Sequence, residues 1–319
     1  KLSPYARVPS VAAVAAVVLS IAYLGAGPAH AGSAAEDGAA WLDGLYDQVA
    51  ARLSGGGPVV IQAHVPLCDS DIIRCGKGAL GDGESVTGNL YWATSGGFLG
   101  WFNRKGSGWT QVAKVAKPDP QLDDILELRV WRRSVKPQGE WRGRGVKARF
   151  DVYVVAYAWS GEAIDATLAA YLEDVYGATA RTIRLDDGTE LAAGGAADIV
   201  AWVGHNRLMD VDPVDWAELA RAHADNATKK GVIAVACHTA DYMAADVPSP
   251  TRVPLLMTRD YLFAGAHSFE GVVSTFAAGG SLAAMRRAAI RTYAKGEGKT
   301  EQHVGGAFTN PADKRWPGT

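Results

Sequence analysis

The sequence lacks a strong excess of charge of either sign. Its 319 residues include 32 Lys and Arg against 34 Asp and Glu, and no dense run of basic residues occurs. A protein that binds nucleic acid or an anionic membrane through bulk charge needs such an excess, so the sequence predicts neither partner. Hydrophobic residues make up 48% of the chain, which suffices for a buried core and excludes a disordered or collagen-like protein.

Long hydrophobic runs are also scarce, and the one long enough to matter lies near the N-terminus. Lys1 and Arg7 flank the start of an apolar stretch over residues 11–27, and "AHA" ending at Ala31 fits a small-residue cleavage site. We therefore expect residues 1–31 to be a signal peptide of an exported protein, periplasmic or extracellular, without membrane contact after cleavage. The alternative is an uncleaved anchor, although the stretch falls a little short of the ~20 residues of a membrane span.

Cysteine is rare, with three residues in the chain. Cys68 and Cys75 lie in "PLCDSDIIRCG", a short polar loop in which an oxidising compartment favours a small disulfide ring. Cys237 is then an unpaired thiol at the end of an apolar strand, and such a thiol in an exported protein is either buried or used chemically. Pairing of Cys237 with Cys68 or Cys75 stays open from the sequence.

Periodic patterns predict alternating helices and strands after the leader. Strands are expected over residues 58–65, 124–135, 148–160, 197–204, 231–237 and 253–258, and helices over 34–53, 89–104, 161–177, 212–230, 266–279 and 281–295. This alternation predicts an α/β fold, a three-layer sandwich with a mainly parallel central sheet. We expect one domain over residues 35–300 and a polar C-terminal tail over 301–319.

Two of the predicted strands end abruptly in polar residues. "AWVGHNRLMD" brings Gly204, His205 and Asn206 directly after an apolar run, and "GVIAVACHTADYM" ends its apolar run at Cys237. If the two strands are parallel neighbours, their carboxyl ends meet at the edge where open α/β sheets bind ligands. An imidazole within reach of a thiol can take its proton, so His205 and Cys237 form a candidate catalytic dyad.

The segments "VAWVGH" and "VIAVAC" resemble the His and Cys strands of the caspase-like cysteine peptidases, which include caspases, legumains, gingipains and clostripain. This resemblance implies a caspase-like fold, with Cys237 as the nucleophile and His205 as the base. The set "PLCDSD", "NLYW", "VGHNRLMD", "VAC" and "PLLMT" more closely resembles exported bacterial proteins of unknown function, over most of the chain beyond the leader. The closer resemblance implies no activity.

The chain departs from the peptidase pattern beside the histidine. Those peptidases have Gly directly after the catalytic His, where its amide helps to hold the oxyanion, whereas the order here is Gly204-His205-Asn206. The Asn206 side chain is either a substitute donor, an interaction worth ~3 kcal/mol in a dry site, or a loop cap. Asp210 and Asp241 follow the two strands, and we name them with Asn206 as candidate substrate-binding residues.

Two functions of different classes follow from this pattern. The chain is either a caspase-like cysteine hydrolase, such as a peptidase, or a catalytically silent domain that binds a peptide or protein partner in the same crevice. No cofactor is predicted. A zinc site built from Cys237, His238, His205 and Asp210 is a third interpretation, which lacks the paired His or CxxC spacing typical of zinc sites. His267 is a further candidate for the same pocket.

Overall fold

The computed structural model describes residues 34–118 and 124–313, so the predicted signal peptide lies outside the described part. Its main sheet has eight strands in the order β10-β9-β8-β7-β1-β4-β3-β2. The central strands β9, β8, β7, β1 and β4 are parallel, while β10, β3 and β2 run antiparallel to their neighbours. The strand bounds are β1 Val59–Pro66, β2 Thr110–Ala116, β3 Ile125–Val135, β4 Phe150–Trp159, β7 Ile199–Val203, β8 Lys230–Val235, β9 Arg252–Thr258 and β10 Phe308–Thr309.

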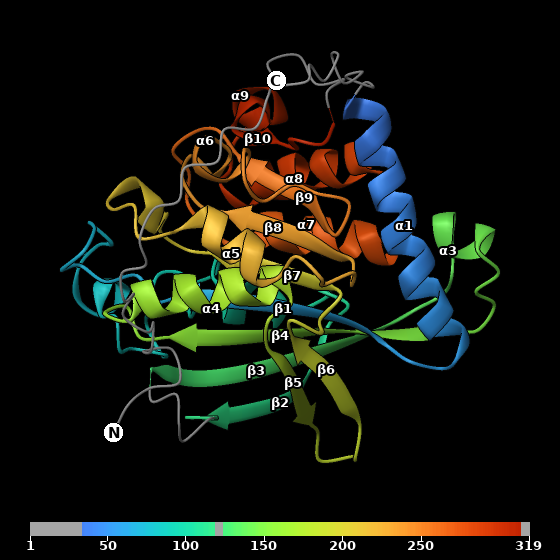
Figure 1. Ribbon diagram of the computed structural model, residues 1–319. Coiled ribbons are helices and arrows are strands. Elements are labelled where there is room, and N and C mark those ends of the chain that lie inside the picture. Colours follow the sequence, from blue (N-terminus) through green and yellow to red (C-terminus); the bar gives the residue numbers. More distant parts are fainter. Residues whose placement is uncertain (1–33, 119–123, 314–319) are drawn as a thin grey trace, which may run out of the picture.

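Helices cover both faces of this sheet (Figure 1). Helices α1 (Ala34–Ser54), α7 (Ala266–Ala277) and α8 (Leu282–Gly296) lie on one face, and α4 (Ile164–Tyr176) and α5 (Trp216–Ala222) on the other. The chain is therefore a three-layer α/β sandwich, as its alternating pattern predicts. Short elements complete it: α2 Phe98–Phe102, α3 Gly139–Gly143, α6 Thr239–Met243, α9 Glu301–Val304 and a separate hairpin of β5 Ala180–Arg184 with β6 Glu190–Gly194. Among the described helices, none is long and apolar enough to cross a membrane.

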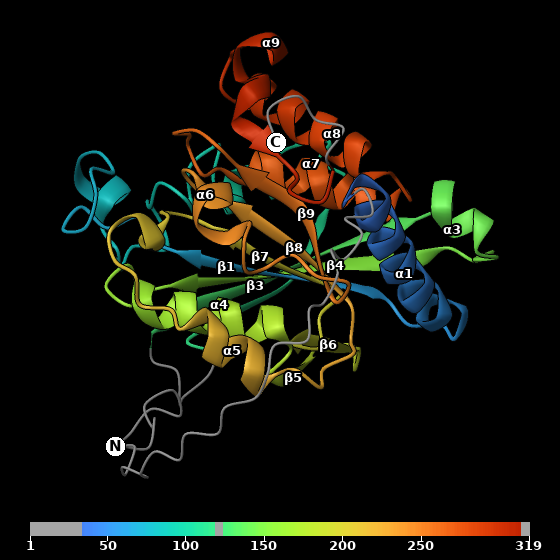
Figure 2. The ribbon, with the colours of Figure 1, turned by 45° about the horizontal axis from the view of Figure 1, so that its top comes forward.

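The parallel strands are apolar over most of their length because both of their faces are buried. In β1, Ile61, Ala63 and Val65 join the core beneath α1, α7 and α8, whereas Val60 joins the core beneath α4. The carboxyl ends of the parallel strands share one edge of the sheet, where the loop after β1 and helix α6 also gather (Figures 1 and 2). Helix α3 lies at the opposite end of the sheet.

The aromatic segment over residues 89–104 differs from the helix predicted there. Only α2 is helical, and the residues before it form turns that fold back, with the Leu99 N–H donating to the Trp92 carbonyl at 2.8 Å. A Cβ at Gly97 would lie 2.8 Å from the Trp92 carbonyl group, a separation that real side chains do not show. The close approach of two backbone segments at this glycine therefore replaces a continuous helix.

The C-terminal segment also differs from the prediction, since residues 301–313 are part of the domain. Helix α9 leads into β10, which pairs with β9 through Phe308↔Thr258, and the Arg286 guanidinium donates to the Phe308 carbonyl at 2.6 Å. Ala312 is buried as well. The sequence signal is weak because β10 has two residues, and residues 314–319 lie outside the described part.

Three further elements were not predicted correctly. Strand β2 is exposed or half-buried at every position, and the β5–β6 hairpin lies outside the main sheet. The helix expected over residues 212–230 shortens to α5, which has no buried residue. Strand β2 and helix α5 bury little apolar surface and so carry little of the periodic pattern on which prediction depends, and the strands of the hairpin have only five residues each.

On the face of the sheet that α4 covers, β1 carries two buried polar side chains, Gln62 and His64. The His64 Nε2 lies 2.9 Å from the carboxylate of Asp174 on α4, and Gln62 contacts the same carboxylate. Nearby, the buried Lys230 ammonium donates to the Gly195 carbonyl. Burial lowers the pKa of Lys230 to about 8, although the Asp174 carboxylate partly opposes this shift.

We expect Lys230 to make the protein more stable as the pH rises from 8 to 10.5. The pKa of its ammonium group falls from 10.5 to about 8 on folding, so the unfolded chain binds more protons across this range. The free energy of unfolding should then rise by roughly 3 kcal/mol, at most, through this one group. Urea unfolding of the wild type and of Lys230→Met at several pH values gives, for each protein, the slope of the free energy of unfolding against pH. The tyrosines titrate in both proteins, so their contribution cancels in the difference between the two slopes. Identical slopes in the two proteins would contradict the assignment.

Candidate functional site

The carboxyl ends of β7 and β8 are tied together at the edge where the sequence predicts a site. The strands are parallel neighbours with the register Val203↔Val235, which confirms the predicted pairing. Beyond them, the Gly204 N–H donates to the Val235 carbonyl at 3.2 Å, and the Asn206 amide donates to the Cys237 carbonyl at 2.7 Å. The residues that follow the two strands therefore form one linked structure.

Gly204 has a steric reason to be a glycine. A Cβ at this position would lie 2.8 Å from the Cγ of Pro66, the last residue of the adjacent strand β1. The turn after β7 can thus pass close to the end of β1 only without a side chain. This close approach brings the loop after β1 and the His205 turn to the same edge.

The thiol of Cys237 is half-buried and faces a backbone carbonyl. Its Sγ lies 3.6 Å from the carbonyl oxygen of Leu262, in the loop after β9. Burial raises the pKa of Cys237, and the nearby Asp260 carboxylate raises it further. The thiol is therefore protonated at neutral pH in this conformation, and its described hydrogen bond goes to Leu262.

The imidazole of His205 is held by a carboxylate. Its Nε2 lies 2.6 Å from Oδ2 of Asp210, and the His205 side chain is 12% exposed. A neutral imidazole that donates Nε2–H to a carboxylate has an unprotonated Nδ1, which can accept a proton. Arg207 completes this group, since it lies 3.5 Å from Asp210 and 2.6 Å from Asp165 on α4.

The backbone turns sharply directly after Cys237. His238 has φ 52° and ψ 31°, a left-handed conformation that is uncommon for a residue other than glycine. Its N–H donates to the Asp260 carbonyl at 3.3 Å, its Nδ1 lies 3.0 Å from Asp241, and its ring packs edge-on against Tyr261. This conformation is strained, so the surrounding structure must hold it in place. Strained residues of this kind are concentrated at functional sites.

A pair of threonines supports the same turn from inside the sheet. The Thr239 hydroxyl donates to the Ala234 carbonyl at 3.0 Å and accepts from the Thr258 N–H at 3.0 Å. The Thr239 N–H donates to the Thr258 hydroxyl at 3.2 Å. Both threonines are fully buried, so the backbone beside Cys237 is fixed by β8 and β9 together.

The three residues predicted to bind substrate are each bonded within the protein. Asn206 uses its amide on the Cys237 carbonyl and accepts from the Leu208 N–H, Asp210 holds His205, and Asp241 holds His238. One N–H of the Asn206 amide is therefore engaged by the Cys237 carbonyl in this conformation. The roles that the contacts indicate are those of positioning residues.

The other candidates do not join the site. His267 is fully buried, its Nε2 lies 3.1 Å from Glu297, and its Nδ1 accepts from the Ser268 N–H, so both ring nitrogens are engaged. Within residues 34–118 and 124–313, no three His, Cys, Asp or Glu side chains are grouped so that they could hold a metal ion. The zinc interpretation therefore has no support in the described part of the chain.

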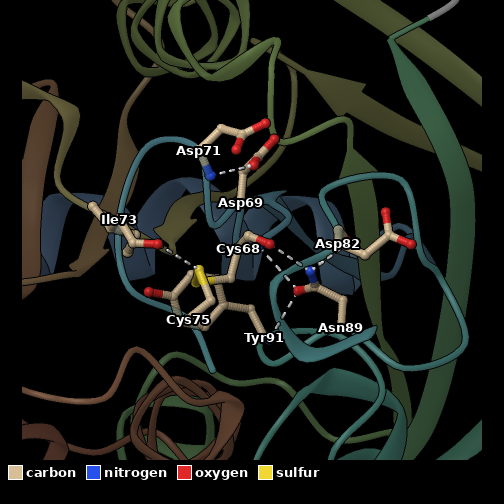
Figure 3. Close-up of a disulfide and its surroundings, with 8 residues drawn as sticks. All are labelled: Cys68, Asp69, Asp71, Ile73, Cys75, Asp82, Asn89 and Tyr91. Carbon is tan, nitrogen blue, oxygen red and sulfur yellow. Dashed lines mark hydrogen bonds between the residues drawn. A yellow bond between two sulfur atoms is a disulfide. The ribbon is translucent and has the colours of Figure 1, made fainter. Parts of the chain in front are cut away.

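The predicted disulfide between Cys68 and Cys75 is confirmed (Figure 3). The S–S bond measures 2.05 Å, the Cα atoms are 5.8 Å apart, and Cys237 is the free cysteine. Asn89 anchors this loop: its side chain accepts from the Cys68 N–H at 3.0 Å and donates to the Cys68 carbonyl at 2.8 Å. Sequence reasoning missed Asn89, because a buried asparagine that bonds backbone groups has no distinctive spacing.

The disulfide loop reaches the thiol through Tyr91. Asn89 Oδ1 also accepts from the Tyr91 N–H at 3.1 Å, which fixes this residue beside the loop (Figure 3). Burial raises the pKa of the Tyr91 hydroxyl, and the neighbouring Cys237 raises it further. Tyr91 and the thiol of Cys237 therefore interact electrostatically at this end of the sheet.

Comparison of the chain with protein-family models, with curated proteins and with solved structures finds no match.

We expect Asn206→Ala to lower the free energy of unfolding by about 1–3 kcal/mol, because it leaves the half-buried Cys237 carbonyl without its donor. The Asn206 side chain is 1% exposed, so water cannot replace the bond without a rearrangement. Urea denaturation measures the loss. Gln302→Ala, which removes an exposed side-chain amide, is the matched control and should change stability by less than about 0.5 kcal/mol. Equal effects of the two substitutions would contradict the link.

We expect loss of the Cys68–Cys75 bond to lower the free energy of unfolding by about 2–3 kcal/mol, the entropic effect of opening so short a loop. The double variant Cys68→Ser/Cys75→Ser and the wild type under reducing conditions should lose similar amounts in a denaturation experiment. Cys237→Ser keeps the disulfide and should remain sensitive to the reductant. A Cys237→Ser protein that no longer responds to reductant would contradict the pairing.

Proposed function

We propose that the chain is a caspase-like cysteine hydrolase, such as a peptidase, with Cys237 as nucleophile and His205 as base. The observation that carries the proposal is the link between the ends of β7 and β8. Asn206, the residue after His205, donates from its side-chain amide to the Cys237 carbonyl. A thiol and an imidazole at one sheet edge, with the imidazole oriented by a carboxylate, is the arrangement that nucleophilic catalysis requires. The Asp210 contact adds the orienting third member.

The proposed reaction uses these groups in order. The His205 Nδ1 takes the thiol proton, and the Cys237 sulfur attacks the carbonyl carbon of an amide to form a tetrahedral intermediate. The C–N bond then breaks as His205 gives its proton to the leaving amine, and water hydrolyses the remaining thioester. Asp210 stabilises the imidazolium that forms between these steps.

The proposal includes export of the protein to an oxidising compartment. The Cys68–Cys75 disulfide supports it, because such bonds persist outside the reducing cytosol. The apolar stretch at residues 11–27 is a second, independent argument from the sequence.

A second candidate function is a catalytically silent domain that binds a peptide or protein partner in the same crevice. The observation that favours it is the state of the thiol: Cys237 donates to the Leu262 carbonyl, and burial raises its pKa. A nucleophilic cysteine usually has a lowered pKa, because the thiolate is the reactive form. The two candidates therefore differ in whether His205 reaches and deprotonates Cys237.

Alkylation of Cys237 by iodoacetamide at pH 7 separates the two candidates. For a hydrolase, we expect Cys237 to be labelled at least about tenfold faster than free cysteine. The labelling rate should fall by about tenfold in His205→Ala and by less in Asp210→Asn. Asp241→Asn is the matched control, since Asp241 bonds His238 and not His205, and Cys237→Ser defines the background. Labelling that rises only at alkaline pH, to the same extent in the wild type and His205→Ala, would instead establish the silent domain.

A further inference from the structure

Two adjoining cavities lie at the amino ends of the central strands, opposite the end of the sheet at which Cys237 lies. One, of about 400 Å³, is formed by the α1–β1 turn at Gly56 and Gly57, the start of β4 and the β5–β6 turn at Thr189. The other, of about 430 Å³, is formed by the segment between β3 and α3. Ser134 lines both, and we refer to the two cavities together as the amino-edge groove.

The amino-edge groove is rich in positive charge. Its lining holds the basic side chains Arg133, Lys136, Arg142 and Arg149 and a single carboxylate, Asp151. The surrounding segment, residues 101–150, has more than twice as many Lys and Arg as Asp and Glu, although the whole chain has net charge −2. This segment therefore carries an excess of positive charge that the chain as a whole does not have.

Two of these cations are available to a ligand. Lys136 and Arg142 are exposed, and within the described residues no carboxylate pairs with either of them. Arg144, close by in sequence, contrasts with them because it contacts Asp43, Asp47 and Glu140. Unpaired cations that line a concave surface attract an anionic ligand.

The other lining groups indicate what kind of anion fits. Phe150 and Tyr153 are buried, at 6% and 3% exposure, so the groove presents no aromatic face on which a nucleic-acid base could stack. The Asp151 carboxylate, which lies 3.8 Å from the Arg132 guanidinium, would repel a ligand made only of phosphates but can accept from hydroxyl groups. Ser134 and Thr189 add hydroxyls of their own.

We propose that the amino-edge groove binds an acidic oligosaccharide, one that carries sulfate or carboxylate groups beside free hydroxyls. Its anionic groups pair with Lys136, Arg142 and Arg149, and its hydroxyls donate to Asp151. The ten residues of β4 separate this edge from the carboxyl ends of the strands by about 30 Å, so a bound sugar does not cover Cys237. The proposal therefore goes beyond the proposed hydrolase and does not depend on it.

Isothermal titration of the protein with a heparin tetrasaccharide tests the proposal. We expect saturable binding that weakens as salt rises, and a loss of at least about tenfold in affinity in the variant Lys136→Gln/Arg142→Gln. The matched control is Lys105→Gln/Arg291→Gln, which removes two exposed cations outside the groove and should leave the affinity within about twofold. Because all four side chains are exposed, both variants should keep the wild-type thermal midpoint.

Competition identifies the class of ligand. Asp151→Asn should weaken tetrasaccharide binding, by loss of the hydroxyl acceptor, and strengthen binding of inorganic tripolyphosphate. Equal affinity of the two double variants would overturn the site, and tighter binding of tripolyphosphate or of single-stranded DNA by the wild type would overturn the sugar assignment. Alkylation of Cys237 reports on the hydrolase separately, so failure of either proposal is recognised independently of the other.

Discussion

Burial of the central sheet on both faces is the constraint on which the rest of the structure depends. Strands β1, β7 and β8 lie between two helical layers and must be largely apolar, so polar side chains are restricted to their ends unless they find a hydrogen-bond partner inside. Parallel pairing places the ends of β7 and β8 level at one edge. His205 and Cys237 are brought to the same edge by these two requirements together, before any contact between side chains is considered.

The same constraint explains how much of the site could be predicted from the sequence. An apolar run that stops at a polar residue marks where a strand leaves the sheet, so the positions of His205 and Cys237 were predictable. The partner of His205 was not, because several aspartates follow the strand and only the turn at η2 (Arg207–Met209) brings Asp210 back to the imidazole. Asn89 and Asn206 were also beyond prediction as anchors, since their bonds to Cys68 and Cys237 join segments distant in sequence.

The buried polar side chains of β1 are the exception that tests the rule. Gln62 and His64 enter the apolar layer beneath α4, where each must be bonded to avoid the cost of desolvation. The Asp174 carboxylate contacts both side chains. Lys230, at the start of β8, donates instead to the backbone carbonyl of Gly195. Asp174 thus ties α4 to β1, and Lys230 ties the start of β8 to the residue that follows β6, so the polar groups that interrupt the core also bond neighbouring elements to one another.

The loop after β9 determines the state of the proposed nucleophile. The Leu262 carbonyl accepts a hydrogen bond from the Cys237 thiol. The Tyr293 hydroxyl accepts from the next backbone N–H, that of Phe263, at 3.1 Å. The loop is therefore fixed at Phe263, while Tyr261, on the other side of Leu262, is 72% exposed. A substrate that displaced Tyr261 would pull on the Leu262 carbonyl, and the thiol released from it would need a new acceptor. In the proposed hydrolase that acceptor is the imidazole of His205, which lies at the same edge of the sheet and is held in place by its bond to Asp210.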